Sequence, residues 1–83
     1  MSGIPQPSLD RGPLRLNVRR RWEIRRDVTG ALLHEVASGD VIFVEVGDTW
    51  KLTRIEFDHA LRTYVSSDGY PIAAGVIAAL PTA

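Results

Sequence analysis

The chain has 83 residues, of which 45% are hydrophobic and 24% charged, a composition typical of one small globular domain that excludes wholesale disorder. Ten basic and ten acidic residues give a formal net charge of zero. The absence of cysteine excludes a disulfide framework, a thiolate zinc site and a cysteine nucleophile.

The N-terminal segment is rich in breakers of regular structure. Residues 1–13 contain three prolines and two glycines but only three apolar side chains. This composition predicts a flexible tail over residues 1–13, followed by a single folded domain over residues 14–80. Residues 1–8 lack a signal-peptide pattern and no apolar run approaches the roughly 20 residues of a membrane span, so we expect a cytoplasmic protein without membrane contact.

Residues 14–25 alternate between apolar and polar side chains, as strands with one wet face do. They predict either one long bent strand or two strands with a break near Arg19 and Arg20. Residues 27–30 have turn chemistry. Residues 31–37 fit a strand or two helical turns, and we favour the strand because the segment is short and lies between turns.

The middle of the chain carries the clearest strand signals. Residues 41–46 are β-branched and aromatic and predict a strand, and a tight turn at residues 47–48 leads into a second strand over residues 49–57. In that second strand the alternation slips, because Trp50 and Leu52 share one parity while Ile55 and Phe57 share the other. The slip predicts either a β-bulge or a strand that changes the side it covers.

The remaining segments are shorter. Residues 62–66 predict a strand, residues 67–69 a turn, and residues 70–72 a short or edge strand, since Pro71 cannot donate to a ladder. Residues 73–80 fit one helical turn or a closing strand. Five or six short strands joined by tight turns predict an all-β fold, a small SH3-like antiparallel β-barrel.

The charge distribution is uneven. Residues 11–26 contain seven arginines and one acid, a net charge of +6, whereas residues 27–83 carry −5. One interpretation is that the arginines pair with acids elsewhere in the domain, and we favour it because the net charge is zero. The other is a nucleic-acid-binding patch. Its candidate residues are Arg15, Arg19, Arg21 and Arg25.

Catalytic motifs are missing from the sequence. His34 and His59 lie 25 residues apart and match no nucleophile motif, and no metal-ligand spacing or glycine-rich phosphate loop occurs. We therefore expect no enzymatic activity, no catalytic residue, no metal and no cofactor.

Aromatic and charged side chains around the 49–57 strand suggest a partner-binding surface. Both Trp22 and Trp50 fit a core position best, because Ile24 and Leu52 follow them in phase, but a tryptophan at the rim would present a flat ring to a partner. The candidate residues are Trp50, Arg54, Glu56, Tyr64 and Tyr70.

The segment from Gly39 to Gly75 resembles a family of small bacterial proteins of unknown function with the outline GD…W…TRIE-x-D…YY…G-x-P…GL. Residues 53–56 and Asp58 match its centre, and Trp50 matches its tryptophan. The chain departs from the outline at Tyr64-Val65 and Gly75-Val76. The resemblance covers roughly residues 20–80 and implies a protein carried on a mobile element such as a phage, plasmid or conjugative element, with no assigned activity.

These observations predict a non-enzymatic module that acts through protein–protein contact. The alternative is nucleic-acid binding by the arginine-rich strands, with a steep salt dependence. A third possibility is a structural subunit that assembles through an edge strand, so the expected state is a monomer or a small homo-oligomer.

Overall fold

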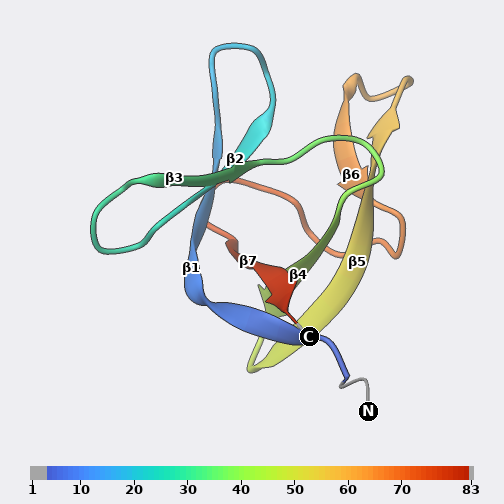
Figure 1. Ribbon diagram of the computed structural model, residues 1–83. Helices are drawn as coiled ribbons and strands as arrows, with labels where there is room; N and C mark the ends of the chain where they lie inside the picture. Colours follow the sequence, from blue (N-terminus) through green and yellow to red (C-terminus); the bar gives the residue numbers. More distant parts are fainter. Residues whose placement is uncertain (1–3, 83) are drawn as a thin grey trace.

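The computed structural model describes residues 4–82, which form seven β-strands and no helix, and hence no helix able to cross a membrane. The strands are β1 (Gln6–Leu16), β2 (Trp22–Arg25), β3 (Leu32–Glu35), β4 (Val41–Val46), β5 (Thr49–Asp58), β6 (Thr63–Ser66) and β7 (Ile77–Thr82). They form one antiparallel sheet in the order β3-β2-β1-β7-β4-β5-β6 (Figure 1). The all-β prediction is confirmed.

The sheet consists of two three-stranded meanders joined by a seventh strand. The first meander is β1–β2–β3 and the second is β4–β5–β6, each with neighbours in chain order. Strand β7 lies between β1 and β4 and pairs with both. The last strand in the sequence therefore holds the two halves together.

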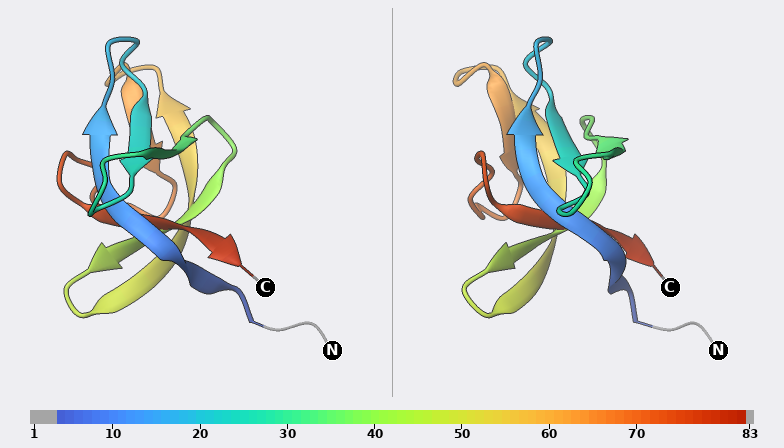
Figure 2. Two further views of the ribbon diagram at one scale, coloured as in Figure 1. Left: turned by 60° about the vertical axis from the view of Figure 1, so that its left-hand side comes forward. Right: turned by 90° about the vertical axis from the view of Figure 1, so that its left-hand side faces the viewer.

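Strands β1 and β5 are the longest, and each changes partner midway. Residues 6–13 of β1 pair with β7 and residues 14–16 pair with β2, whereas residues 49–54 of β5 pair with β4 and residues 55–58 pair with β6. The sheet is consequently strongly curved, with its inner face on the concave side (Figure 2). It does not close into a barrel, because the two edge strands β3 and β6 do not pair with each other.

The core fills the inner side of the curled sheet. Period-two alternation sends Ile42 and Val44 of β4 inward, where both are fully buried, while Phe43 points to the outer face. Trp22 is 8% exposed and belongs to this core, as expected. The buried cluster comprises Leu14, Trp22, Ile24, Val36, Ile42, Val44, Ile55 and Ala78.

Gly12 marks the closest approach between β1 and the chain that follows β2. A β-carbon at this position would lie 1.7 Å from the carbonyl oxygen of Arg25 and 2.7 Å from the nitrogen of Asp27. The Asp27 N–H donates to the carbonyl of Arg11 at 3.2 Å, so the two backbones are in direct contact. Only glycine leaves room for this crossing.

The prediction of a tail over residues 1–13 is wrong from Gln6 onward, because β1 begins there and pairs with β7. Residues 1–3 lie outside the described part of the chain. Prolines are tolerated in residues 6–13 since the ladder to β7 uses only one edge of the strand, so a missing N–H at the other edge costs little. Composition alone cannot reveal a strand of this kind.

Several finer predictions can be decided. The break near Arg19 and Arg20 is confirmed, since β1 ends at Leu16 and β2 begins at Trp22. The slip in β5 is not a bulge, because its registers with β4 and β6 run without a shift. The strand instead covers the outer face with its first half and the core with its second. Residues 70–72 form no strand, and the closing strand is β7.

Candidate functional site

The five predicted partner-binding residues do not form one surface. Trp50, Arg54 and Glu56 share the outer face of β5, as their spacing requires. Glu56 pairs with Val65, so Tyr64 points to the opposite side, where its ring contacts Phe57 at 5.1 Å. Tyr64 and Tyr70 are both partly buried against the core cluster. Both tyrosines therefore lie outside the surface formed by the other three.

The outer face has a row of side chains that crosses four strands. Arg11 of β1 is opposite Ala79 of β7, Ala79 is opposite Phe43 of β4, and Phe43 is opposite Leu52 of β5. Ala79 is fully buried and Phe43 is 6% exposed, although both lie outside the main core cluster. The small Ala79 side chain leaves space for its larger neighbours to meet above it.

Trp50 packs into this outer layer. Its ring meets Phe43 edge-on, with centroids 6.5 Å apart and an interplanar angle of 88°, the preferred geometry for an aromatic pair. The Arg11 guanidinium lies 4.7 Å from the centroid of the Trp50 ring, a cation–π contact. Trp50 is therefore half-buried on the outer side of the sheet and does not belong to the main core.

From Trp50 toward Arg54 the outer face of the β4–β5 ladder carries exposed apolar side chains. Val41 is 42% exposed and Leu52 41%. We call Val41, Trp50 and Leu52 the outer strip. Arg54 and Glu56 border it and contact each other at 3.9 Å in an exposed ion pair that contributes little to stability. Both charges are thus available to a partner.

Three of the four predicted nucleic-acid residues form ion pairs within the domain. Arg19 lies 2.6 Å and Arg21 3.6 Å from Glu35, and Arg25 lies 2.8 Å from Glu23. Because Glu23 faces Glu35 across β2 and β3, these partners form one network on the outer face of the first meander. Arg15 is exposed and has no ion pair with any acid in residues 4–82.

Asn17 connects the two glutamates of this network. Its side-chain amide donates to Glu23 at 3.1 Å and to Glu35 at 2.8 Å. The hydrogen bond from Asn17, together with the bond from Arg25, lowers the pKa of Glu23 below its usual 4.5. The predicted pairing of arginines with acids elsewhere in the domain is confirmed for Arg19 and Arg21, which pair with Glu35. Arg25 instead pairs with Glu23 of the same segment.

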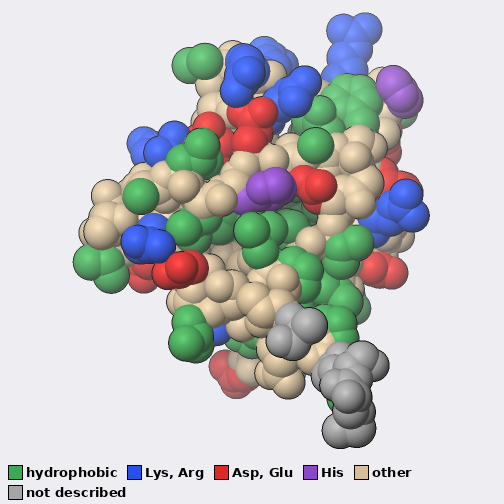
Figure 3. All heavy atoms as spheres, viewed as in Figure 1, with side chains coloured by type: hydrophobic (Ala, Val, Ile, Leu, Met, Phe, Trp, Pro, Cys, Tyr) green, Lys and Arg blue, Asp and Glu red, His purple; other side chains and the backbone are tan. Residues whose placement is uncertain are grey.

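The end of the β1–β2 hairpin is basic and exposed. Val18, at the tip, is fully exposed, and Arg20 has a positive φ of 61° there. Figure 3 shows basic side chains gathered around this hairpin, with acidic side chains next to them. The acids partly neutralise the basic end.

The remaining polar clusters hold loops in place. Nε2 of His34 lies 2.7 Å from the Asp40 carboxylate, which also accepts the N–H of Ala37 at 2.8 Å. Burial acts to raise the pKa of Asp40, but these two hydrogen bonds outweigh it and lower the pKa below its usual 3.8. In residues 4–82 no group of three or more histidine, aspartate or glutamate side chains is placed to hold a metal ion.

A second polar cluster, formed by Thr53 of β5, Ser66 of β6 and Asp68, holds the turn after β6 in place. Thr53 donates to Asp68 at 2.8 Å, and its oxygen lies 2.5 Å from the Ser66 hydroxyl. Ser66 therefore donates to Thr53 and accepts the backbone N–H of Asp68. The Asp68 carboxylate already occupies this turn, which disfavours an anion there.

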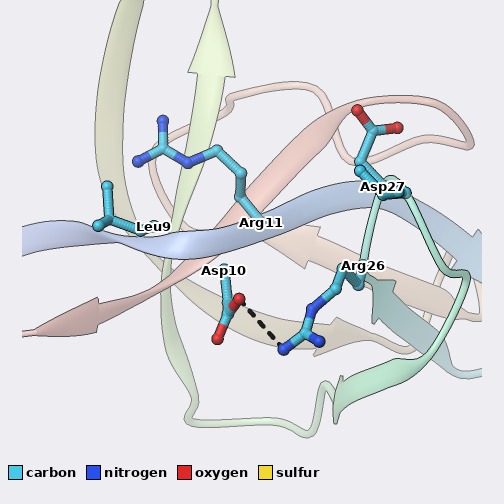
Figure 4. A pocket seen from close by; sticks show the side chains of 6 residues that line it. Leu9, Asp10, Arg11, Arg26 and Asp27 are labelled. Atoms are coloured by element: carbon cyan, nitrogen blue, oxygen red, sulfur yellow. Dashed lines mark ion pairs between the residues drawn. The ribbon is translucent and has the colours of Figure 1, made fainter.

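A shallow hollow of about 300 Å³ lies where β1 meets the loop after β2. Leu9, Arg11, Asp10 and Arg26 contribute to its lining. Figure 4 shows Leu9 and Arg11 pointing to one side of β1, and Asp10 and Arg26 forming an ion pair on the other. That pair is 3.1 Å long and exposed.

Arg11, Val41 and Leu52 are the site residues that sequence reasoning missed. Arg11 was hidden in a segment read as a tail. Val41 was visible in principle, because β4 carries apolar residues at both parities and a strand of that kind is covered on both faces.

Scans against family models, curated proteins and solved structures found no match to this chain.

Proposed function

We propose that this protein is a non-enzymatic binding module that contacts another protein through the outer strip and its charged border. The observation that carries the proposal is the exposure of Val41 and Leu52 on the outer face of a regular β4–β5 ladder that also carries the half-buried Trp50. Aromatic and aliphatic anchors on a rigid surface are the residues that dominate protein–protein contacts. Arg54 and Glu56 supply a polar rim.

The fold and origin enter as further parts of this proposal. Strong curvature and two meanders of sequential antiparallel strands support a relationship to small SH3-like barrels, with the sheet left open between β3 and β6. Carriage on a mobile element follows only from the sequence resemblance. Neither is needed for the binding proposal, which rests on the chemistry of the outer strip.

The test is selection of binders from a random-peptide display library, followed by affinity measurements on variants. Leu52→Gln removes the apolar contact without adding charge, and Leu32→Gln is the matched control, since Leu32 is 50% exposed on β3. We expect Leu52→Gln to weaken the selected peptides about tenfold, equivalent to roughly 1.4 kcal/mol, and Leu32→Gln to change affinity less than twofold. Peptides that bind Leu52→Gln as tightly as the unmodified protein would contradict the proposal.

A second candidate function is nucleic-acid binding by the β1–β2 hairpin. Arg15 and Arg20 favour it because both are exposed and neither forms an ion pair with a described acid. It ranks second because Glu23 and Glu35 neutralise the neighbouring arginines. Titration of fluorescent DNA and RNA at two salt concentrations decides it, since log affinity should fall by about 0.7–0.9 per phosphate neutralised for each tenfold rise in salt.

A further inference from the structure

Arg11 is held in place from two directions. Its guanidinium stacks on Trp50 at 4.7 Å, and its Nε donates to the backbone carbonyl of Ser8 at 3.0 Å. The register of β1 with β7 shifts between Pro7 and Arg11, and this irregularity turns the Ser8 carbonyl toward the arginine. An arginine fixed by its ring contact and its Nε loses little further conformational entropy when it binds a ligand.

Among the described residues, the two terminal nitrogens of Arg11 have no hydrogen-bond or ion-pair partner. Within residues 4–82 the guanidinium makes no hydrogen bond other than the one from Nε, and no carboxylate forms an ion pair with it. By contrast, Arg19, Arg25 and Arg26 each contact a carboxylate at 2.6–3.1 Å. Asp10, the acid next to Arg11 in sequence, is paired with Arg26 on the opposite side of β1 (Figure 4).

We infer that the terminal edge of Arg11 is a receptor for a carboxylate, supplied by an acidic side chain of the protein segment that covers the outer strip. This inference rests on the proposed function and names the chemistry of its partner. The planar fork of an arginine matches the two oxygens of a carboxylate, and each bond is charge-assisted. The partner is therefore an acidic peptide segment with an apolar residue nearby.

The sheet register sets the spacing within that segment. Arg11 and Leu52 lie on one row with β7 and β4 between them, so their backbones are about 14 Å apart at roughly 4.8 Å per strand. An extended peptide advances about 3.3 Å per residue, and the arginine side chain leans toward Trp50. The acidic and apolar residues of the partner should thus lie within about four positions of each other.

The surrounding charges favour a carboxylate over a phosphate. Glu45 lies opposite Trp50 on the outer face, Glu56 borders the outer strip, and Asp27 lines the hollow beside Arg11. These acids repel a dianion or a polyanionic strand more strongly than a single carboxylate. The exposed Leu52, two residues from the Trp50 ring that Arg11 covers, likewise matches a peptide better than a nucleic acid.

The first test measures the fork alone, by nuclear magnetic resonance of the 15N-labelled protein. Sodium acetate is titrated against sodium chloride at equal ionic strength, and the Nε–H signal of Arg11 and the indole N–H signal of Trp50 are followed. We expect both to shift saturably with acetate, and the signal of Arg15, an exposed arginine on the same strand, to stay unchanged. An Arg11 shift no larger than that of Arg15 overturns the inference.

The second test is a double-mutant cycle on peptides selected by display that depend on Leu52. Replacing the peptide's acidic residue by its amide should weaken binding about tenfold to the unmodified protein and to Arg15→Gln, and have no effect on Arg11→Gln. Arg11→Lys keeps the charge and the aliphatic stem but not the planar fork, so it should retain less than half of the coupling free energy between residue 11 and the peptide's acidic residue. A thermal melt of this variant checks that it is folded.

The outcomes separate the two proposals. Leu52-dependent peptides without an essential acid overturn the carboxylate receptor and leave the binding module standing, whereas loss of Leu52 dependence overturns the module itself. Displacement of the peptide by 10 mM inorganic phosphate but not by 10 mM acetate would identify a phosphate site and also overturn the inference.

Discussion

Replacing Gly12 by alanine should be one of the most damaging single-methyl changes in this protein. The added β-carbon would lie 1.7 Å from the Arg25 carbonyl oxygen. The backbone fixes the position of both atoms, so no side-chain rotation can relieve the clash. Relief requires β1 and the chain after β2 to separate, which breaks the bond from the Asp27 N–H to the Arg11 carbonyl. Overpacking typically costs about 1–3 kcal/mol, and we expect at least the upper value here because no side chain can yield. Domains of this size have roughly 5 kcal/mol in total.

The assay is urea denaturation followed by tryptophan fluorescence, with Trp22 as the buried reporter. With a slope of about 1 kcal/mol per molar urea, the midpoint should fall by about 3 M, or the variant should be unfolded without denaturant. Gly39→Ala is the control, because Gly39 has a φ of 94° but nothing within 4 Å of its added carbon, so only backbone strain of about 1–2 kcal/mol applies. If the two variants lose the same stability, the backbones of Gly12 and Arg25 are not in close contact in solution.

Three further outcomes follow from the networks described above. Glu35→Gln should cost about 1–2 kcal/mol in urea denaturation, since one carboxylate serves Asn17 and two arginines, and a cost below 0.3 kcal/mol would mean that the network is not formed in solution. Because the folded-state pKa of both Glu23 and Asp40 is lowered, the stability they contribute is present above their usual values of 4.5 and 3.8 and is lost as pH falls through the lower folded values. The urea concentration at the denaturation midpoint, measured from pH 6 to pH 2.5, should therefore decrease once the pH is below about 4.5. Glu23→Gln should make this decrease with pH less steep, and an equally steep decrease would contradict the lowered pKa of Glu23. Ala79→Leu should place a bulky group under the outer layer and shift the indole N–H resonance of Trp50 while the core signals stay in place, whereas an unperturbed indole signal would show that Ala79 does not support that layer.

The sequence predicts which side chains share a face better than it predicts which face they cover. Alternation correctly places Trp50 and Leu52 on one face, and β-branched and aromatic composition identifies β4. The break near Arg20 is one of the two alternatives that the pattern leaves open. Alternation could not show that Tyr64 faces inward, because that depends on the register of Glu56 with Val65 across a hairpin.

Long-range pairing explains the larger errors. Residues 6–13 of β1 are predicted as a tail because their prolines and glycine break local patterns, yet their partner β7 lies more than 60 residues away. The contact of Arg11 with Trp50 likewise joins residues that no local window contains. Local propensity carries no information about partners at that separation.

The central position of β7 has a consequence for the order of events during synthesis. The two meanders consist of neighbours in the chain and can pair as soon as each is made. The β1–β7 ladder instead closes a loop that spans most of the sequence, and the β7–β4 ladder must wait for the last strand. A ribosome adds roughly 5–20 residues per second, so for a few seconds β1 and β4 present unpaired edges to other chains. The first half of β1 contains prolines, which cannot donate a backbone hydrogen bond, and it is therefore a poor template for strands of other chains during that interval. Its composition thus disfavours aggregation before β7 is made.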